Sequence, residues 1–391
     1  MTQEEGPVAV RRILMTLVVI SLVSLVSCQQ AGDGRKESRA LSDEEFPRPA
    51  EGLTRNVYIC ERLRGSPVID GRINEEEWKG SEWTEDFVDI TGGGEYPPLR
   101  TQARMAWDDE YFYVAARLEE PHISATLTEH DAVIWHDNDF EVFIDPDGDT
   151  HEYYEIEINA AGTIFDLFLV KPYRDGGPAL HHWDIAGLKK AVGIEGTLND
   201  PSDRDAGWEV EMAIPWIVLA ECANKAAPPS EGDVWRINFS RVEWKTVVEG
   251  GRYVKATDSE TGKPYAESNW TWTAQGLVNM HYPERWGYVL FTNATRAYGG
   301  AKFEPGPDEE AWDALRELYY AEQTWMLRYG EYTADFGSLG LGNREIFGHQ
   351  WPPVLEATTN RFEARLYSSD GSSAKQIVED GRTRIVEEPG S

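Results

Sequence analysis

Residues 134–159 carry the pattern that constrains the fold of this chain most tightly. Within them, two short segments alternate apolar and polar side chains, and a loop rich in proline, glycine and aspartate joins the segments. Such alternation places successive side chains on opposite faces of a β-strand. The apolar positions are Phe140, Val142, Ile144, Tyr154, Ile156 and Ile158, and the acidic positions are Asp139, Glu141, Glu155 and Glu157. The stretch predicts a β-hairpin with one buried face and one open face that carries a row of carboxylates.

Further segments that favour strands extend this pattern over much of the chain. They cover residues 57–60, 101–107, 111–118, 163–170, 189–194, 208–214, 234–244 and 288–291. A short helix is expected at residues 75–79, with Asn74 as its N-cap. Many short strands without crossover helices predict an all-β fold, namely an antiparallel β-sandwich over residues 56–293.

The last part of the chain, residues 300–391, has a different pattern. Residues 307–329 begin with acidic side chains and then repeat large apolar ones at intervals of three to four, which predicts a helix. Residues 362–366 and 382–386 are expected to form short strands. We interpret this region as a helical appendage packed on the sandwich, and an independent small domain is the alternative.

The N-terminal residues have the organisation of a secretory signal. Two arginines precede an apolar run that ends at the small residue Ser27, and Cys28 follows. A charged start, a short apolar core and a small residue at the end predict a signal peptide over residues 1–28 rather than a spanning helix. The polar residues 29–55 are expected to form a flexible tether.

Residues 25–28 resemble a bacterial lipobox. This resemblance implies that Cys28 is lipidated and becomes the first residue of the mature protein, and an uncleaved anchor is the alternative. Gln29 follows the cysteine, and the sorting rule of such lipoproteins then favours the outer membrane over the inner one. We therefore expect a protein exported to the cell envelope.

The formal net charge of −32 limits the partners of the chain. A nucleic-acid binder neutralises phosphates with Lys and Arg, and basic patches attach proteins to anionic lipids. We therefore expect no nucleic-acid partner, and contact with a membrane only through lipidated Cys28. The other two cysteines, Cys60 and Cys222, are expected either to pair in an oxidising compartment or to remain free thiols.

Six segments carry a resemblance to a known family. They are IDGRINEEEW (69–78), WDDEYFYVAARL (107–118), IWHDNDFEVFIDPDGD (134–149), WEVEMAIPW (208–216), VWRINFSRVEW (234–244) and NMHYPERWGYVLF (279–291). Together and in this order they resemble the family 9 carbohydrate-binding module and its bacterial relatives. The resemblance implies a DOMON-like β-sandwich of the jelly-roll type, which binds sugars between aromatic rings and often holds structural calcium.

The same resemblance implies a sugar site that includes Trp135 and Glu141. In the family, a Trp before a strand stacks on the sugar ring and a Glu of that strand bonds its hydroxyls. Glu155 stands where the sugar-binding members carry a basic residue, and Met280 and His281 stand near the place of the second Trp. The candidates for the site are Trp135, Glu141, Glu155, Arg241, Trp244, Trp270, His281 and Arg285, with Trp272 as an alternative to Trp270.

Three aspartates in the loop of the hairpin are candidates for a cation site. Asp145, Asp147 and Asp149 alternate with Pro and Gly. Oxygen ligands in a tight loop suit calcium, although the spacing is not that of an EF-hand. A calcium ion is the cofactor that this loop predicts, and a solvated turn without an ion is the alternative.

The chain has no nucleophile elbow, phosphate loop or HExxH motif. We expect non-catalytic binding of a polysaccharide or oligosaccharide, in support of carbohydrate catabolism. One alternative is a divergent glycoside hydrolase that uses Glu141 and Glu155. The other is a haem-binding electron-transfer domain, which needs Met105 with His281, because adjacent Met280 and His281 point to opposite sides of a strand.

Overall fold

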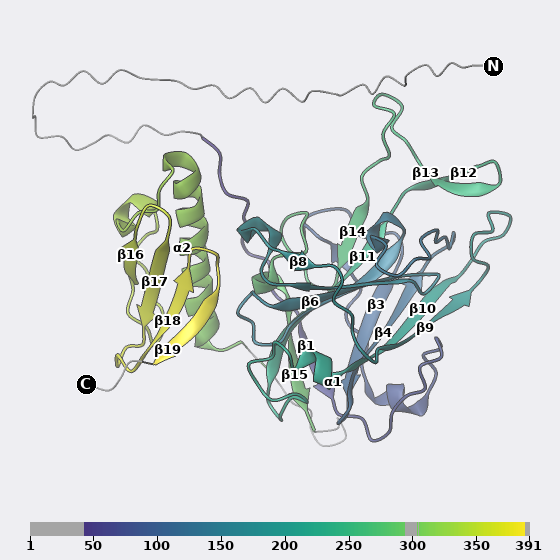
Figure 1. Cartoon of the computed structure of the whole chain (residues 1–391), viewed down its shortest axis with the longest axis horizontal. Coiled ribbons are helices and arrows are strands. Elements are labelled where there is room, and N and C mark those ends of the chain that lie inside the picture. The colour runs from purple at the N-terminus through teal and green to yellow at the C-terminus, as the bar shows by residue number, and fades with distance from the viewer. Residues whose placement is uncertain (1–42, 294–302, 304, 388–391) are drawn as a thin grey trace, which may run out of the picture. The chain divides into compact units, whose positions relative to one another are not determined.

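Two facing β-sheets form a sandwich in the computed structural model, which describes residues 43–293, 303 and 305–387 (Figure 1). The expected signal segment and Cys28 lie outside the described residues. No helix of the described part is long and apolar enough to cross a membrane.

The larger sheet has nine strands. In spatial order they are β1 (Val57–Glu61), β15 (Gly287–Thr292), β11 (Val234–Glu243), β5 (Asp139–Asp145), β6 (Tyr153–Asn159), β7 (Ile164–Leu169) and β8 (Ala179–Leu180), while β14 (Ser268–Thr271) pairs with β11 and with β2 (Val88–Asp89). Strand β1 is added in parallel beside β15, and the other neighbours are antiparallel. The expected all-β sandwich is confirmed.

The smaller sheet has four strands, all antiparallel to their neighbours. In spatial order they are β3 (Thr101–Trp107), β4 (Tyr111–Glu119), β10 (Gly207–Pro215) and β9 (Lys189–Glu195). The register places Val114 of β4 opposite both Met105 and Met212. These three side chains therefore lie in one row on the inner face of the sheet.

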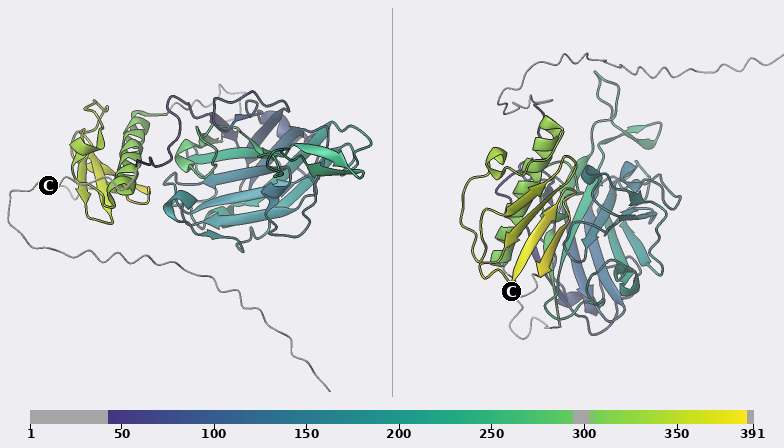
Figure 2. Two further views of the ribbon diagram at one scale, coloured as in Figure 1. Left: turned by 90° about the horizontal axis from the view of Figure 1, so that it is seen from above. Right: turned by 60° about the vertical axis from the view of Figure 1, so that its left-hand side comes forward.

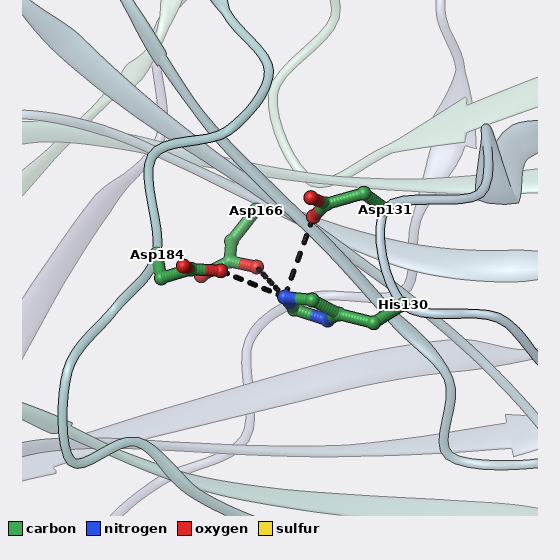
Figure 3. A group of neighbouring side chains, drawn as sticks. All are labelled: His130, Asp131, Asp166 and Asp184. Carbon is green, nitrogen blue, oxygen red and sulfur yellow. Dashed lines mark hydrogen bonds and ion pairs between the residues drawn. The ribbon is translucent and has the colours of Figure 1, made fainter.

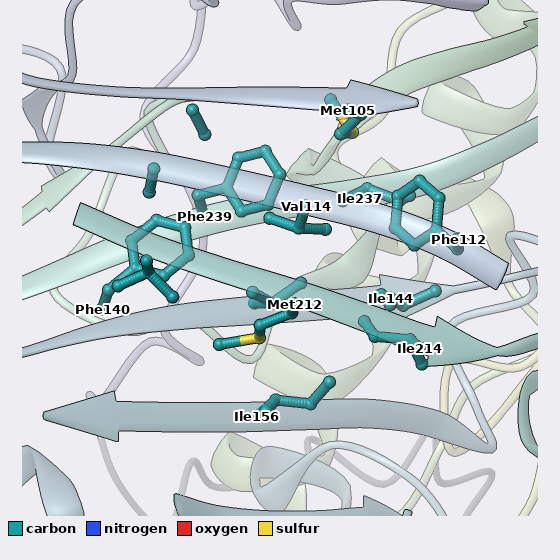
Figure 4. Packing of buried hydrophobic residues seen from close by; sticks show 14 of the residues in the cluster. Met105, Phe112, Val114, Phe140, Ile144, Ile156, Met212, Ile214, Ile237 and Phe239 are labelled. Carbon is teal, nitrogen blue, oxygen red and sulfur yellow. The ribbon is translucent and has the colours of Figure 1, made fainter. Parts of the chain in front are cut away.

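Apolar side chains at alternate positions of both sheets fill the space between them (Figure 4). Phe140, Ile144 and Ile156 of the larger sheet are fully buried there, as are Val114 and Met212 of the smaller one. Full burial of one such side chain contributes roughly 1.5–3 kcal/mol. The alternation in residues 139–159 thus predicted the inward face of the hairpin correctly.

The acidic face of the same hairpin is covered, so the expected open face is wrong. Its four carboxylate residues are each at most 5% exposed. A second apolar cluster lies on this side, and its members are Ile90, Ile134, Phe143, Tyr153, Phe165, Leu167, Leu169, Met280 and Trp286. Because Ile134, Met280 and Trp286 come from the connecting segments, those segments fold over the outer face of the sheet.

Glu211 of β10 organises the segment that precedes the first short helix. Its carboxylate accepts hydrogen bonds from the backbone N–H groups of Asp70, Gly71 and Arg72 at 3.2, 2.9 and 3.1 Å. It also accepts one from the indole N–H of Trp78 at 2.8 Å. Four donors on one fully buried acid make this side chain the anchor of the segment.

The short helix itself, η1 (Glu76–Gly80), is a 3-10 helix. It begins after Glu75 without a side-chain cap, so the prediction that Asn74 caps it is wrong. The remaining short elements are η2 (Ile134–His136), η3 (Tyr173–Asp175), α1 (Trp216–Leu219), the hairpin of β12 (Thr246–Glu249) and β13 (Arg252–Lys255), η4 (Pro283–Arg285) and η6 (Phe336–Leu339).

The expected C-terminal helix is confirmed as α2 (Pro307–Tyr329), which ends at Gly330 in the left-handed conformation. It packs against a second antiparallel sheet (Figure 2). In spatial order the strands of that sheet are β16 (Val354–Ala357), β17 (Phe362–Tyr367), β18 (Ser373–Val378) and β19 (Thr383–Glu387). The sequence predicted β17 and β19 but not β16 and β18.

Glu284 connects this region with the sandwich. Its carboxylate accepts hydrogen bonds from the guanidinium group of Arg174 at 2.9 Å and from the hydroxyl of Tyr320 in α2. Burial alone would raise the pKa of Glu284, but Arg174 and its other donors hold that pKa at about 2. The carboxylate is therefore ionised at neutral pH and holds α2 on the sandwich.

Residues 43–55, expected as the end of a flexible tether, are attached instead. The backbone N–H of Phe46 donates to Thr324 of α2 at 3.1 Å, and that of Ala50 donates to the carbonyl of Gly276 at 3.1 Å. Hydrogen bonds between residues far apart in the sequence hold this segment in place, although its polar composition alone would predict a mobile segment.

Cys60 and Cys222 are free thiols. Cys60 is fully buried, and burial raises the pKa of both thiols above the ordinary value. Of the two alternatives, the structure therefore supports unpaired cysteines.

Replacing Glu211 with Ala leaves three backbone donors and one indole donor without their acceptor. We expect the free energy of unfolding to fall by about 3 kcal/mol, because unpaired buried donors are costly. Urea denaturation measures this change. Glu195→Ala, an exposed acid on the neighbouring strand β9, is the control and should change stability by less than about 0.5 kcal/mol. Equal effects of the two substitutions would contradict the anchoring role.

Candidate functional site

Strands β5 and β6 place four carboxylates together on the outer face of the larger sheet. The register sets Glu141 opposite Glu157, and Asp139 and Glu155 occupy the same face of the hairpin. Oxygen atoms of Asp139, Glu141 and Glu157 lie within 4.8 Å of one another. The alternation that buries the apolar side chains inside the sandwich therefore also gathers these acids outside it.

Burial changes the ionisation of these acids. It raises the pKa of Glu141 to about 7, and it raises those of Asp139, Glu155 and Glu157 well above their ordinary values, with the neighbouring carboxylates adding to the effect at these three. One buried oxygen of Asp139 has no hydrogen-bond partner. A group of this kind shares protons near neutral pH, so its members both donate and accept hydrogen bonds.

Two nearly parallel indole rings lie at the rim of this acid group. The ring centroids of Trp135 and Trp244 are 6.3 Å apart with an angle of 17° between their planes. The backbone N–H of Trp135 donates to Glu157 at 2.8 Å, and the indole N–H of Trp244 donates to the carbonyl of Trp135 at 2.8 Å. These bonds fix Trp135, which is 36% exposed, directly beside the acids.

The spacing of the two indoles determines how a flat ligand can use them. A ring between two aromatic faces needs about 7–8 Å, which is two contacts of 3.5–4.0 Å. The indoles are closer than that, and the ammonium group of Lys255 lies 3.2 Å from the centroid of the Trp244 ring. A flat ring therefore does not fit between Trp135 and Trp244, and the exposed part of Trp135 is the surface that remains for stacking.

His281 and Tyr173 lie beside the same acids. The Nδ1 atom of His281 is 2.9 Å from the hydroxyl of Tyr153, and its Nε2 atom is 4.0 Å from Glu155. Burial lowers the pKa of His281 to about 3, which makes it neutral at physiological pH. The centroids of the His281 and Tyr173 rings are 4.5 Å apart with an angle of 79° between the planes, and Tyr173 is 47% exposed.

The acid group also changes the pKa of Tyr173. Burial, together with Glu155 and Glu157, raises the pKa of its hydroxyl to about 12. Trp135 donates to Glu157, so two exposed rings, one from η2 and one from η3, both interact with Glu157.

Three predicted site residues do not belong to this group. Arg241 is 1% exposed and lies on the inner face of β11, where it pairs with Glu120 at 2.9 Å and Glu243 at 2.8 Å. Trp270 is buried in the main core, as is its alternative Trp272. The structure therefore removes Arg241 and Trp270 from the candidate ligand contacts.

The third is Arg285. Its guanidinium group donates to the backbone carbonyl of Leu53 at 2.7 Å. Arg285 therefore fastens the N-terminal segment to η4.

The aspartates of the hairpin loop come together as the calcium prediction requires. Oxygen atoms of Asp145, Asp147 and Asp149 lie within 4.8 Å of one another. Arg382 pairs with Asp149 at 2.6 Å, and both oxygens of Asp145 accept backbone hydrogen bonds from the loop. The group can hold an oxygen-preferring cation, and calcium there stays a prediction.

The pair that a haem iron requires is not formed. Met105 lies in the core between the sheets, whereas His281 lies on the outer side of the larger sheet with Glu155 and Tyr153. A strand layer separates the two side chains, so they cannot ligate one iron.

Sequence reasoning missed several residues of the group. Asp139 and Glu157 share the face of Glu141 and Glu155, so the alternation carried a signal for both. Tyr173 and Lys255 come from an irregular segment and from β13, and no sequence pattern linked them to the hairpin.

The comparisons with known proteins agree with this architecture. A family model described as carbohydrate family 9 binding domain-like matches residues 69–294, more than half of the chain. The chain belongs to this family. The match spans the sandwich except for β1, and it includes the acid group and Trp135.

Curated relatives match this chain over only a small part of much longer enzymes. Exoglucanase XynX of Acetivibrio thermocellus is 25% identical over 167 residues, which are 42% of this chain and 13% of that enzyme. Endo-1,4-beta-xylanase A of Thermotoga maritima is 32% identical over 99 residues, which are 25% of this chain and 9% of that enzyme. The chain thus matches only a small share of each relative.

Among solved structures, a carbohydrate binding module family 9 from Caldicellulosiruptor kristjanssonii in complex with cellotriose is similar to this chain. The alignment has a TM-score of 0.39 and 16% identity, and it covers 64% of this chain and 100% of that module.

The acids of this family 9-like domain predict an unusual pH dependence of stability. The pKa of Glu141 is about 7 in the folded protein against an ordinary value of 4.5, so between these values the folded state binds more protons than the unfolded state. The contribution of Glu141 to the free energy of unfolding should therefore decrease as pH rises from about 4.5 to 7, whereas His281, whose pKa is lowered, contributes in the opposite direction below 6.5. Urea midpoints across this range measure the slope.

Glu141→Gln should shift the slope of the free energy of unfolding against pH in the positive direction, because glutamine does not titrate. Glu249→Gln, at an exposed position of β12, should leave it unchanged. A slope that is the same in the wild type and in Glu141→Gln would contradict the raised pKa.

Proposed function

We propose that this domain binds carbohydrate without catalysis on the outer face of its larger sheet. The single observation that carries the proposal is the exposed ring of Trp135, fixed beside a row of carboxyl groups by its own hydrogen bond to Glu157. Membership of the carbohydrate family 9 binding domain-like family supports the same conclusion.

The chemistry of the surface suits a neutral polyhydroxylated ring. The apolar C–H face of a pyranose stacks on an indole, while its hydroxyls exchange hydrogen bonds with the small part of Glu141 and Glu155 that remains at the surface, since each of these residues is 5% exposed. Because the pKa values of Glu141, Glu155 and Glu157 are raised, these groups donate as well as accept near neutral pH. A ligand without charge meets no unpaired ion in such a site.

Tyr173 is our candidate for the second stacking ring. It is exposed, and its hydroxyl lies in the field of Glu155 and of Glu157, the acid that accepts the hydrogen bond of Trp135. Trp244 supports Trp135 from behind through its indole hydrogen bond. In this arrangement the sugar lies over Glu155 and Glu157, with one aromatic ring at each end.

The ligand class we propose is a chain of 1,4-linked β-sugars. The curated relatives are named as an exoglucanase and as endo-1,4-beta-xylanases, so glucan and xylan fragments are the first candidates.

We also propose that Cys28 is lipidated and anchors the domain in the cell envelope, at the outer membrane, where it would capture such fragments for catabolism. The lipobox-like residues 25–28 support this location.

Isothermal titration calorimetry with cello- and xylo-oligosaccharides tests the site. Trp135→Ala should weaken binding at least about tenfold, equivalent to about 1.4 kcal/mol, because the stacking face is lost. Tyr173→Ala should also weaken it. Trp325→Ala, a ring in α2 that stacks on Tyr329, is the control and should bind as the wild type does. Undiminished binding by Trp135→Ala would refute this location.

A further inference from the structure

A second group of titratable side chains lies away from the proposed sugar site. It joins His130 and Asp131, which precede η2, with Asp166 of β7 and with Asp184, which follows β8 (Figure 3). Asp166 occupies an inward position of β7, opposite Ile156, whereas the sugar site lies on the outer face. The two sites therefore use opposite faces of the same sheet.

The imidazole of His130 is the centre of the group. Its Nε2 atom is 2.7 Å from Asp184, 3.4 Å from Asp131 and 3.8 Å from Asp166, in each case measured to the Oδ1 atom. Figure 3 shows the three carboxylates converging on that nitrogen from separate segments. All four ligand atoms lie within 4.8 Å of one another.

Two of these oxygens are buried without a hydrogen-bond partner. They are Oδ1 of Asp131 and Oδ1 of Asp166, the two atoms that face His130. Asp166 is only 2% exposed, and its other oxygen accepts the backbone N–H of Ile185 at 2.6 Å. Its carboxylate is thus held in a fixed orientation with one oxygen aimed into the group. A buried acceptor without a donor is costly unless something else occupies the space.

The negative charges of this group are not balanced by nearby positive charges. A protonated His130 would supply one positive charge against three carboxylates. Lys190 is near Asp166, but its ammonium group donates to the carbonyl of Gly162. A divalent cation would supply the missing charge and would use both orphaned oxygens.

We propose that His130, Asp131, Asp166 and Asp184 bind a divalent first-row transition-metal ion such as Zn²⁺. Zinc accepts imidazole nitrogen and carboxylate oxygen at about 2.0–2.2 Å, and tetrahedral ligands at that radius are about 3.4 Å apart. The three distances around His130 bracket this value. An imidazole in the set favours such an ion over calcium or magnesium, which prefer oxygen alone.

The ion has an entry path and a structural consequence. The side chains of His130 and Asp184 are 56% and 65% exposed, so the group is open to solvent on their side. His182 is also close, with Nδ1 3.5 Å from the second oxygen of Asp131. A bound ion would connect β7 with the segment that carries His130 and Asp131 and with the segment that carries Asp184. It would also stabilise the folded state by mass action.

Calorimetric titration of the purified, chelator-treated protein with zinc chloride tests the proposal. We expect one site per chain, and at least about tenfold weaker binding in His130→Gln and in Asp184→Asn. Both side chains are largely exposed, so these variants should fold even where Asp166→Asn does not. Thermal unfolding with and without zinc chloride is the second readout, and the stabilisation seen in the wild type should be lost in both variants.

Two matched controls separate this site from others. His122→Gln removes an exposed imidazole elsewhere, and Asp203→Asn neutralises an exposed aspartate outside the acidic groups described above. Both should bind zinc as the wild type does. No zinc binding by the wild type, or wild-type affinity in His130→Gln and Asp184→Asn, would overturn the assignment.

Discussion

The packing of alternate side chains between two sheets is the constraint on which the rest of this structure depends. Phe140, Val142 and Ile144 of β5 are fully buried inside the sandwich, so Asp139 and Glu141 must face the other way. A shift of one residue in the register would expose the apolar set and bury the acids in the core. The position of the acid group is therefore determined by the hydrophobic core, before any ligand is considered.

The segments that cover the outer face turn this row of acids into the binding site that we propose. They bury the carboxyl groups, raise the pKa values and leave Trp135 and Tyr173 exposed at the rim. The backbone hydrogen bond of Trp135 to Glu157 fixes the first exposed ring. The second, Tyr173, packs against the ring of His281, which in turn is within hydrogen-bond distance of the Tyr153 hydroxyl. A site held in this way requires little reorganisation when a ligand binds.

Local patterns in the sequence predicted the longer strands of the sandwich and α2, because each of these elements is long enough to show its period. The alternation in β11 also shows why Arg241 is not a ligand contact. Arg241 lies on the same face of the strand as Trp235, Ile237 and Phe239, which is the face toward the core. Coverage of the acid face was not predictable, because Met280 and Trp286 reach it from distant parts of the chain. Short strands such as β14 were not predicted, because they are held by pairing with distant strands and are too short to show a period. Trp270 lies in β14, so its position in the core was not predicted either.

The most direct measurement is a crystal structure of the protein with a bound cello- or xylo-oligosaccharide. The account predicts a sugar ring stacked on the exposed face of Trp135, with hydroxyls in contact with the carboxyl groups of β6 and a neighbouring sugar against Tyr173. A sugar bound on the smaller sheet, or on the C-terminal region with no contact to Trp135, would contradict it.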